Sequence, residues 1–181
     1  MKYKPGQTFF WKGGGFFGSV IKFYNWRTFG SSDLPTHVGI ITLVEKDRVQ
    51  IHEATNQGFV KGWKSKKWLN SQIGKKVAFG EVNTKLVSVL KNAEKYEGIK
   101  YGWINIFMHG VSLLVKEIFG GKLKFTDGEK TLHCSEGVSR VLYDSSLKKI
   151  NFETEYGVPF DSISPAHIYL SKQINILPKS L

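Results

Sequence analysis

The sequence predicts one α+β domain in which a sheet of paired strands packs against helices. Its length of 181 residues and hydrophobic content of 41% are enough for one chain to bury its own core. Two apolar runs at residues 37–44 and 49–54, joined by a short polar turn, predict a β-hairpin. Apolar residues spaced three to four apart after Cys134, the single cysteine, predict a helix.

The N-terminal part of the chain predicts a strand followed by a helix. Residues 6–11 have the apolar character of a strand, and the three glycines at 13–15 predict a turn. Residues 16–29 have apolar side chains at helical spacing and predict a short amphipathic helix. Aromatic residues of this helix are expected to form either an apolar wall for an acyl chain or part of the core: Phe16, Phe17, Phe23, Trp26 and Phe29.

The rest of the chain outside the hairpin alternates strand and helix patterns. Strand-like residues are followed by helical spacing that ends at a glycine, and a second, more apolar helical pattern comes before the cysteine. The predicted elements are a strand at 77–82, helices at 84–96 and 101–119, an extended segment at 158–163 and a final helix at 166–171.

A basic segment without acidic residues lies between residues 54 and 80. Its lysines and tryptophans would either form a solvated loop whose indoles cover the core, or an anion-binding surface on which bases or sugars stack. The residues that would make up this surface are Lys61, Trp63, Lys64, Lys66, Lys67 and Trp68, with Lys75 and Lys76 further along. The solvated loop is the interpretation that the composition favours.

Charge and composition narrow the class of protein. The formal net charge of +11 favours anionic partners, such as an anionic lipid surface, a wall polymer or nucleic acid. The N-terminus lacks the apolar stretch of a signal peptide, and no run reaches the roughly 18 apolar residues of a membrane span. We therefore expect a cytoplasmic protein without a transmembrane segment, unless a non-classical or phage-type route exports it.

The position of Cys134 suggests a reactive thiol. The predicted helix begins at or just after this residue, with Val138, Val141 and Leu142 on one side and Glu136 in the first turn. A helix N-terminus favours thiolate over thiol and lowers a cysteine pKa from roughly 8.5 to about 3.5–7.5. Because a lone cysteine cannot form an internal disulfide, its chemistry is the main clue to function.

A nucleophilic cysteine needs a base within hydrogen-bond reach, and five histidines are candidates. His37 opens a predicted strand, where its ring is held firmly but exposed. His52 lies on the paired strand, and His133 adjoins Cys134 but should point to the opposite side. His109 falls in an apolar helix, and His167 has no evident partner in the sequence.

Five short motifs follow one another along nearly the whole chain: Thr36-His37-Val38-Gly39-Ile40, Glu53-Ala54, Gly98-x-x-Tyr101, His133-Cys134-Ser135-Glu136 and Ser164-Pro165-Ala166. In this order they resemble the permuted NlpC/P60 hydrolases, the YiiX-like and lecithin–retinol acyltransferase-like branch of the papain-like superfamily. The opening Gly6-Gln7 departs from this pattern, because Gln7 stands where Asp is usual. The resemblance implies a circularly permuted papain-like fold for residues 1–181, an antiparallel sheet packed against helices including the cysteine helix.

The resemblance also implies roles for individual residues. Cys134 would be the nucleophile and His37 the general base, in the reversed chain order that the permuted branch shows. Glu53 would orient His37, with His52 as the rival third member, since the acyltransferase branch uses a second histidine on that strand. Only one of these neighbours can face His37, and the apolar side shared with Val49 and Ile51 favours Glu53. Tyr101 would line the site or help to hold an oxyanion.

We therefore expect a cysteine hydrolase or acyltransferase that acts on an amide, ester or thioester through an acyl-Cys134 intermediate. Lipid acyl groups and cell-wall peptides are the substrate classes, and the lipid class is ranked first. No cofactor and no metal site are expected, because the histidines lack ligand spacing. The alternative is a non-enzymatic basic module on the same fold that binds nucleic acid or an anionic surface and leaves Cys134 inert.

Overall fold

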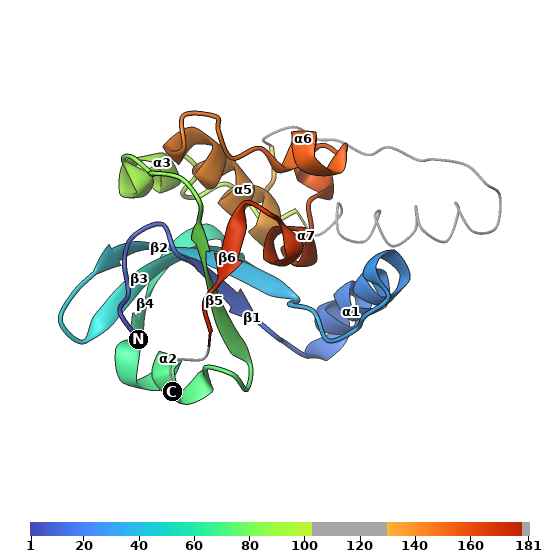
Figure 1. Ribbon diagram of the computed structural model, residues 1–181, viewed down its shortest axis with the longest axis horizontal. Helices are drawn as coiled ribbons and strands as arrows, with labels where there is room; N and C mark the ends of the chain where they lie inside the picture. The colour runs from blue at the N-terminus through green and yellow to red at the C-terminus, as the bar shows by residue number, and fades with distance from the viewer. Residues whose placement is uncertain (103–129, 179–181) are drawn as a thin grey trace.

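The computed structural model describes residues 1–102 and 130–178, which form an antiparallel sheet with helices on both of its faces (Figure 1). The sheet has the strand order β4-β3-β2-β1-β5-β6, and every neighbouring pair is antiparallel. The α+β class and the antiparallel sheet are therefore confirmed. The strands are β1 (Thr8–Trp11), β2 (His37–Val44), β3 (Arg48–Thr55), β4 (Gly58–Ser65), β5 (Val77–Val82) and β6 (Ile174–Ile176).

Helices cover both faces of the sheet, and one further helix lies at the periphery of the molecule. Figure 1 shows α3, α5, α6 and α7 on one face, α2 on the other, and α1 at the periphery. Helix α5 packs on β2 and β3 and also contacts α3, η1 and α7. The helices are α1 (Gly15–Phe29), α2 (Lys66–Gln72), α3 (Val89–Glu94), α5 (Cys134–Ser145), α6 (Phe152–Tyr156) and α7 (Pro165–Leu170), with the 3-10 turn η1 (Phe160–Ser162).

The protein has two clusters of buried apolar residues, one on each face of the sheet, because successive residues of a strand point to opposite faces. On one face Val38 and Ile40 pack with the buried face of α5, formed by Val138, Val141 and Leu142 as its spacing predicted. On the other face a second buried cluster contains Phe9, Ile41, Val49, Ile51, Leu69 and Phe79. This double packing holds the first residues of β2 and α5 in place, and these two residues are His37 and Cys134.

Most predicted elements agree with the structure, and three do not. The basic segment predicted as a loop contains β4 and α2, because β4 pairs along its whole length with β3 and Leu69 anchors α2 in the core. Helix α3 starts at Val89 rather than 84, after Ser88 in a left-handed conformation. The extended segment predicted at 158–163 contains the turn η1. The predicted helix at 101–119, with His109, lies almost entirely outside the described residues.

The close approach of α5 to the sheet depends on Gly137. A Cβ added at this position would lie 2.6 Å from the ring of Phe59, which is fully buried. We expect Gly137→Ala to destabilise the fold by about 1–3 kcal/mol, because the ring cannot move without disturbing a packed core. Denaturant unfolding at neutral pH measures this loss.

The matched control is Gly62→Ala on the edge strand β4, where a Cβ has open space. This variant should leave the midpoint of unfolding almost unchanged. Equal midpoints for Gly137→Ala and the wild type would show that α5 does not rest on Phe59 as closely as described.

Candidate active site

Cys134 is the first residue of α5, and His133 holds the start of this helix. The Nδ1 of His133 accepts a hydrogen bond from the Glu136 amide at 3.3 Å and lies 3.1 Å from the Ser135 hydroxyl. Its Nε2 lies 2.7 Å from the carbonyl oxygen of Asp161, to which it can donate. Both ring nitrogens of His133 are therefore engaged, which suits a capping residue better than a general base.

His37 and Glu53 form a short hydrogen-bonded pair on adjacent strands. The Nε2 of His37, the first residue of β2, lies 2.7 Å from Oε2 of Glu53 on β3. In the strand register Glu53 lies opposite Gly39, where a Cβ would come within 2.7 Å of the Ile51 side chain. A glycine at this position lets β3 approach closely, so that Glu53 can reach two residues back along β2 to His37.

His52, the rival third member, has other partners. It is fully buried, and its Nδ1 lies 2.8 Å from the Thr42 hydroxyl. Its ring lies against Phe59, with the ring centroids 5.9 Å apart, and its Nε2 is 3.9 Å from a Glu97 carboxylate oxygen. The structure thus places Glu53, and not His52, against His37.

Lys64 is an unpredicted neighbour of this pair. Its Nζ lies 3.1 Å from Oε1 of Glu53. One carboxylate oxygen of Glu53 therefore contacts the lysine ammonium, and the other contacts the His37 ring. Lys64 was considered only as part of the basic surface, because its pairing with Glu53 requires the β3–β4 register. A cation at this carboxylate helps to keep it ionised.

Tyr101 lies beside the start of the cysteine helix because of backbone pairing. Tyr101 forms a parallel bridge with Leu132, supported by the Leu132 amide to the Lys100 carbonyl at 2.9 Å and the Gly102 amide to the Leu132 carbonyl at 3.1 Å. Its hydroxyl lies close enough to Cys134 for the thiolate charge to act on it. Burial, and then the nearby thiolate charge, raise the pKa of Tyr101, so the hydroxyl stays protonated and can donate.

The thiol of Cys134 and the ring of His37 lie close enough for each group to shift the pKa of the other. Burial raises the pKa of the thiol, but the charge of His37 and hydrogen bonds with His133 and His37 outweigh it and lower this pKa to about 5. Burial lowers the pKa of His37, but Cys134 and Glu53 outweigh it and raise this pKa to about 10. Since Nε2 of His37 is engaged by Glu53, Nδ1 is the nitrogen left for the sulfur.

Glu53 stays ionised next to this pair. Burial raises the pKa of its carboxyl, but hydrogen bonds and charges from His37 and Lys64 outweigh burial and lower this pKa to about 2. The site therefore holds a thiolate, an imidazolium and a carboxylate together over the neutral pH range.

These shifts predict an unusual pH dependence for the alkylation of Cys134. The thiolate should dominate from pH about 5 upward and the imidazolium should persist to pH about 10. The rate of reaction with iodoacetamide should therefore rise through pH 5 and stay nearly level from pH 6 to 9. The same protein unfolded in denaturant is the control. Its alkylation rate should rise at about pH 8–9, because an unperturbed cysteine thiol has a pKa of about 8.5. A single rise near that range for the folded protein would contradict the ion pair.

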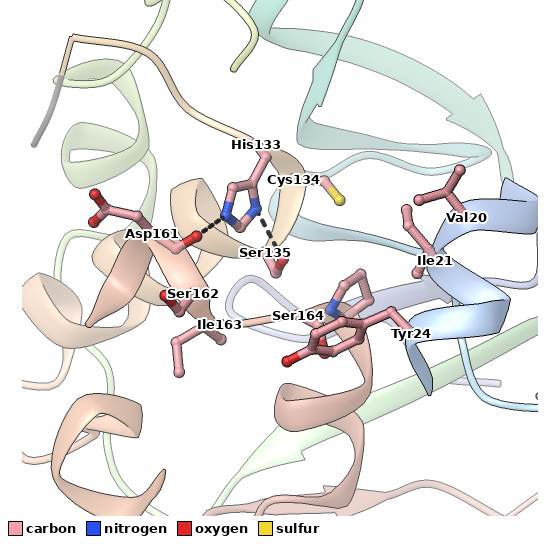
Figure 2. A pocket seen from close by; sticks show the side chains of 11 residues that line it. Val20, Ile21, Tyr24, His133, Cys134, Ser135, Asp161, Ser162, Ile163 and Ser164 are labelled. Atoms are coloured by element: carbon pink, nitrogen blue, oxygen red, sulfur yellow. Dashed lines mark hydrogen bonds between the residues drawn. The ribbon is translucent and has the colours of Figure 1, made fainter. Parts of the chain in front are cut away.

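The sulfur of Cys134 opens onto an apolar pocket. Figure 2 shows it pointing into the space between α5 and the α1 side chains Val20 and Ile21. The empty space of the pocket is about 490 Å³ when the solvent at its open mouth is included, and only a small part of this space is enclosed. It is lined by Val20, Ile21 and Tyr24 of α1, by His133, Cys134 and Ser135, and by Asp161, Ser162, Ile163, Ser164 and Pro165.

The pocket wall differs from the aromatic wall that the sequence suggested. Phe16, Phe23 and Trp26 are exposed on the surface of α1, so they belong neither to the core nor to the pocket lining. The segment from η1 to the start of α7 lines the other side, where Ser164 caps α7 in a reciprocal arrangement with His167. No local sequence signal marks Asp161–Pro165 as a pocket wall, because only the packing of α7 against α5 brings it there.

The basic surface lies on β4 and α2, away from the pocket. Trp63 and Trp68 are each 40% exposed, but both already have ring contacts. The Arg48 guanidinium lies over Trp63 at 4.3 Å, and Trp68 stacks on Trp11 with centroids 5.7 Å apart. The two indoles are thus part of the surface packing and only partly open to a ligand.

Within residues 1–102 and 130–178, no helix has both the length and the apolar character needed to cross a bilayer.

No protein-family model and no curated protein matches the sequence. The structure is similar to the crystal structure of the metalloprotein YiiX from Escherichia coli O157:H7, with a TM-score of 0.60 and 16% identity over 98% of this chain and 97% of that chain. The predicted YiiX-like fold is confirmed.

Proposed function

We propose that this chain, built on the YiiX fold, is a cysteine-dependent acyl hydrolase or acyltransferase with Cys134 as nucleophile, His37 as general base and Glu53 as the residue that orients His37. The observation that carries the proposal is that Cys134, which lines an apolar pocket, lies beside His37, and that His37 is hydrogen-bonded to Glu53. A nucleophile, a base in contact with it and a third group that orients the base are the parts that acyl transfer through a covalent intermediate needs.

Acylation begins with the Cys134 thiolate. Its sulfur attacks the carbonyl carbon of an ester, thioester or amide, and a C–S bond forms as the carbonyl oxygen takes up the negative charge. The tetrahedral species collapses, the bond to the leaving group breaks, and the His37 imidazolium gives its proton to the departing alkoxide, thiolate or amine. A thioester on Cys134 and a neutral His37 result.

Deacylation reverses these roles. Neutral His37 takes a proton from water or from an acceptor amine as its oxygen or nitrogen attacks the thioester carbon. The C–S bond breaks, the acid or the new amide leaves, and the thiolate and imidazolium are restored. Tyr101 and the backbone amide of Cys134 are the donors proposed for the oxyanion in both steps, because the first lies near the sulfur and the second lies at a helix N-terminus.

The pocket favours an acyl chain over a peptide as the group bound beside Cys134. Aliphatic and ring surfaces from Val20, Ile21, Ile163 and Pro165 form much of its lining, and these bury methylene groups rather than pairing peptide amides. A lipid or other long-chain acyl donor is thus the substrate class that we rank first, and a cell-wall peptide second.

The similar protein YiiX is described as a metalloprotein. In the described ranges 1–102 and 130–178, no three His, Cys, Asp or Glu side chains are grouped so that they could hold a metal ion. His37 and Glu53 are instead engaged with each other. This pairing supports the proposed mechanism through the thiol.

The alternative function, a non-enzymatic basic module, rests on the charge of +11 and on the lysines of β4 and α2. It requires an inert thiol, whereas the contacts of Cys134 with His37 and Tyr101 favour a reactive one. Salt-sensitive binding of DNA with ordinary thiol kinetics would support the module instead.

Intact-protein mass spectrometry tests the proposed enzyme directly. We expect incubation with p-nitrophenyl octanoate to add one octanoyl mass to the wild type, and p-nitrophenyl acetate to react more slowly because its chain leaves the pocket empty. Cys134→Ala should show no adduct with either ester, since no other cysteine is present. Equal labelling of Cys134→Ala would place the acyl group elsewhere and overturn the proposal.

A further inference from the structure

Helix α1 carries an exposed aromatic stripe on the side turned away from the core. Phe16, Phe23 and Trp26 expose 72%, 44% and 51% of their surface, and they follow one another at intervals of seven and three residues. The ring centroids of Phe23 and Trp26 lie 6.0 Å apart, so these two side chains form one contiguous apolar patch. Soluble proteins rarely expose several large aromatic side chains together unless they contact a partner.

The helix that carries this stripe has a net positive charge. Helix α1 contains Lys22 and Arg27 and no acidic residue, and no Asp or Glu occurs among residues 1–32. The Arg27 guanidinium lies 5.2 Å from the centroid of the Trp26 ring. Aromatic residues beside basic ones, on a helix lying at the periphery of the molecule (Figure 1), are the pattern of helices that bind in the headgroup region of anionic bilayers.

Other residues of the same helix form the pocket wall. Val20, Ile21 and Tyr24 face the space onto which Cys134 opens (Figure 2). A bilayer that contacted the aromatic stripe would therefore be separated from the reactive sulfur by one helix diameter, which is about 10–12 Å with side chains. This distance is short enough for an acyl chain to leave the bilayer and enter the pocket.

We propose that α1 docks the protein on an anionic lipid bilayer through Phe23 and Trp26, with Lys22 and Arg27 at the headgroups. The proposal deepens the proposed function by making a bilayer lipid the source of the acyl chain, and to that extent it rests on that function. The other two exposed indoles, Trp63 and Trp68, are less suited to the role, because each is 40% exposed against 51% for Trp26 and Trp68 stacks on Trp11.

Sedimentation with vesicles of phosphatidylcholine and phosphatidylglycerol tests the docking. The wild type should bind, and Phe23→Ser/Trp26→Ser should bind at least about tenfold more weakly, because two buried rings are lost. Raised salt, or Lys22→Gln/Arg27→Gln, should weaken binding to these vesicles and not to pure phosphatidylcholine. The matched control Trp63→Ser/Trp68→Ser should bind as the wild type does, and thermal unfolding checks that each variant is folded.

Quenching by brominated lipids locates the contact. The wild type should lose tryptophan fluorescence on such vesicles, while Trp26→Phe should still sediment with them and show less quenching. Absence of binding by the wild type, equal binding by Phe23→Ser/Trp26→Ser, or loss of binding only in Trp63→Ser/Trp68→Ser would overturn the docking. None of these measurements needs a reactive thiol, so failure of the docking and failure of acylation at Cys134 are seen separately.

Discussion

Replacing His37 by alanine is expected to remove nearly all acyl transfer and to return Cys134 to an ordinary thiol. The imidazolium lowers the pKa of the thiol to about 5, and without it only the helix N-terminus and His133 favour the thiolate. If the pKa rises to roughly 8.5, the thiolate fraction at pH 6 falls about 300-fold. A thiolate of higher pKa is more nucleophilic, which offsets part of this loss, so alkylation at pH 6 should slow by about 5- to 12-fold.

Acyl transfer should suffer more than alkylation in this variant. His37 also supplies the proton of the leaving group and takes one from water, and loss of such a group typically costs a further factor of about 10²–10⁴. The measurements are the pH profile of iodoacetamide alkylation and the turnover of p-nitrophenyl octanoate. An alkylation profile of His37→Ala that still rises near pH 5 would show that His37 does not stabilise the thiolate.

Replacing Glu53 by glutamine is expected to lower the turnover of p-nitrophenyl octanoate by about 10²–10⁴, as loss of the orienting carboxylate does in other triads. Glu53 pairs with Nε2 of His37 at 2.7 Å and thus leaves Nδ1 facing the sulfur. A neutral amide can bind the ring in the wrong tautomer and no longer stabilises the imidazolium, so the pKa of His37 should fall. Activity should then be lost at a lower pH than in the wild type, because the protonated form of His37 that supplies the leaving-group proton is lost at that lower pH.

His52→Gln is the matched control for Glu53→Gln, since it changes the neighbouring residue of β3 and leaves the Glu53–His37 pair in place. His52 contacts Thr42 and Phe59, so this variant should lose some stability and keep its turnover within a few-fold of the wild type. The reverse result, with Glu53→Gln active and His52→Gln inactive, would assign the third position to His52.

Much of the fold was predictable because the relevant signals are local. The hairpin of β2 and β3, strand β5 and helix α5 follow from short-range patterns of apolar residues, and the structure confirms them. Strand β4 and helix α2 were missed because an edge strand that alternates lysine, glycine and tryptophan has no apolar alternation to mark it. Its pairing with β3 supplies the stabilisation that the pattern does not show.

The sequence by itself determined which residues could carry the chemistry: one cysteine at a helix start, a histidine at a strand start, and a carboxylate two positions beyond Ile51. Only the tertiary structure decided which of them meet. The β2–β3 register puts Glu53 against His37, the β3–β4 register adds Lys64, and the packing of α1 and η1 over α5 shapes the pocket. The physical reason is that periodicity reports which side of an element is buried, whereas contacts between distant segments depend on packing across the whole chain.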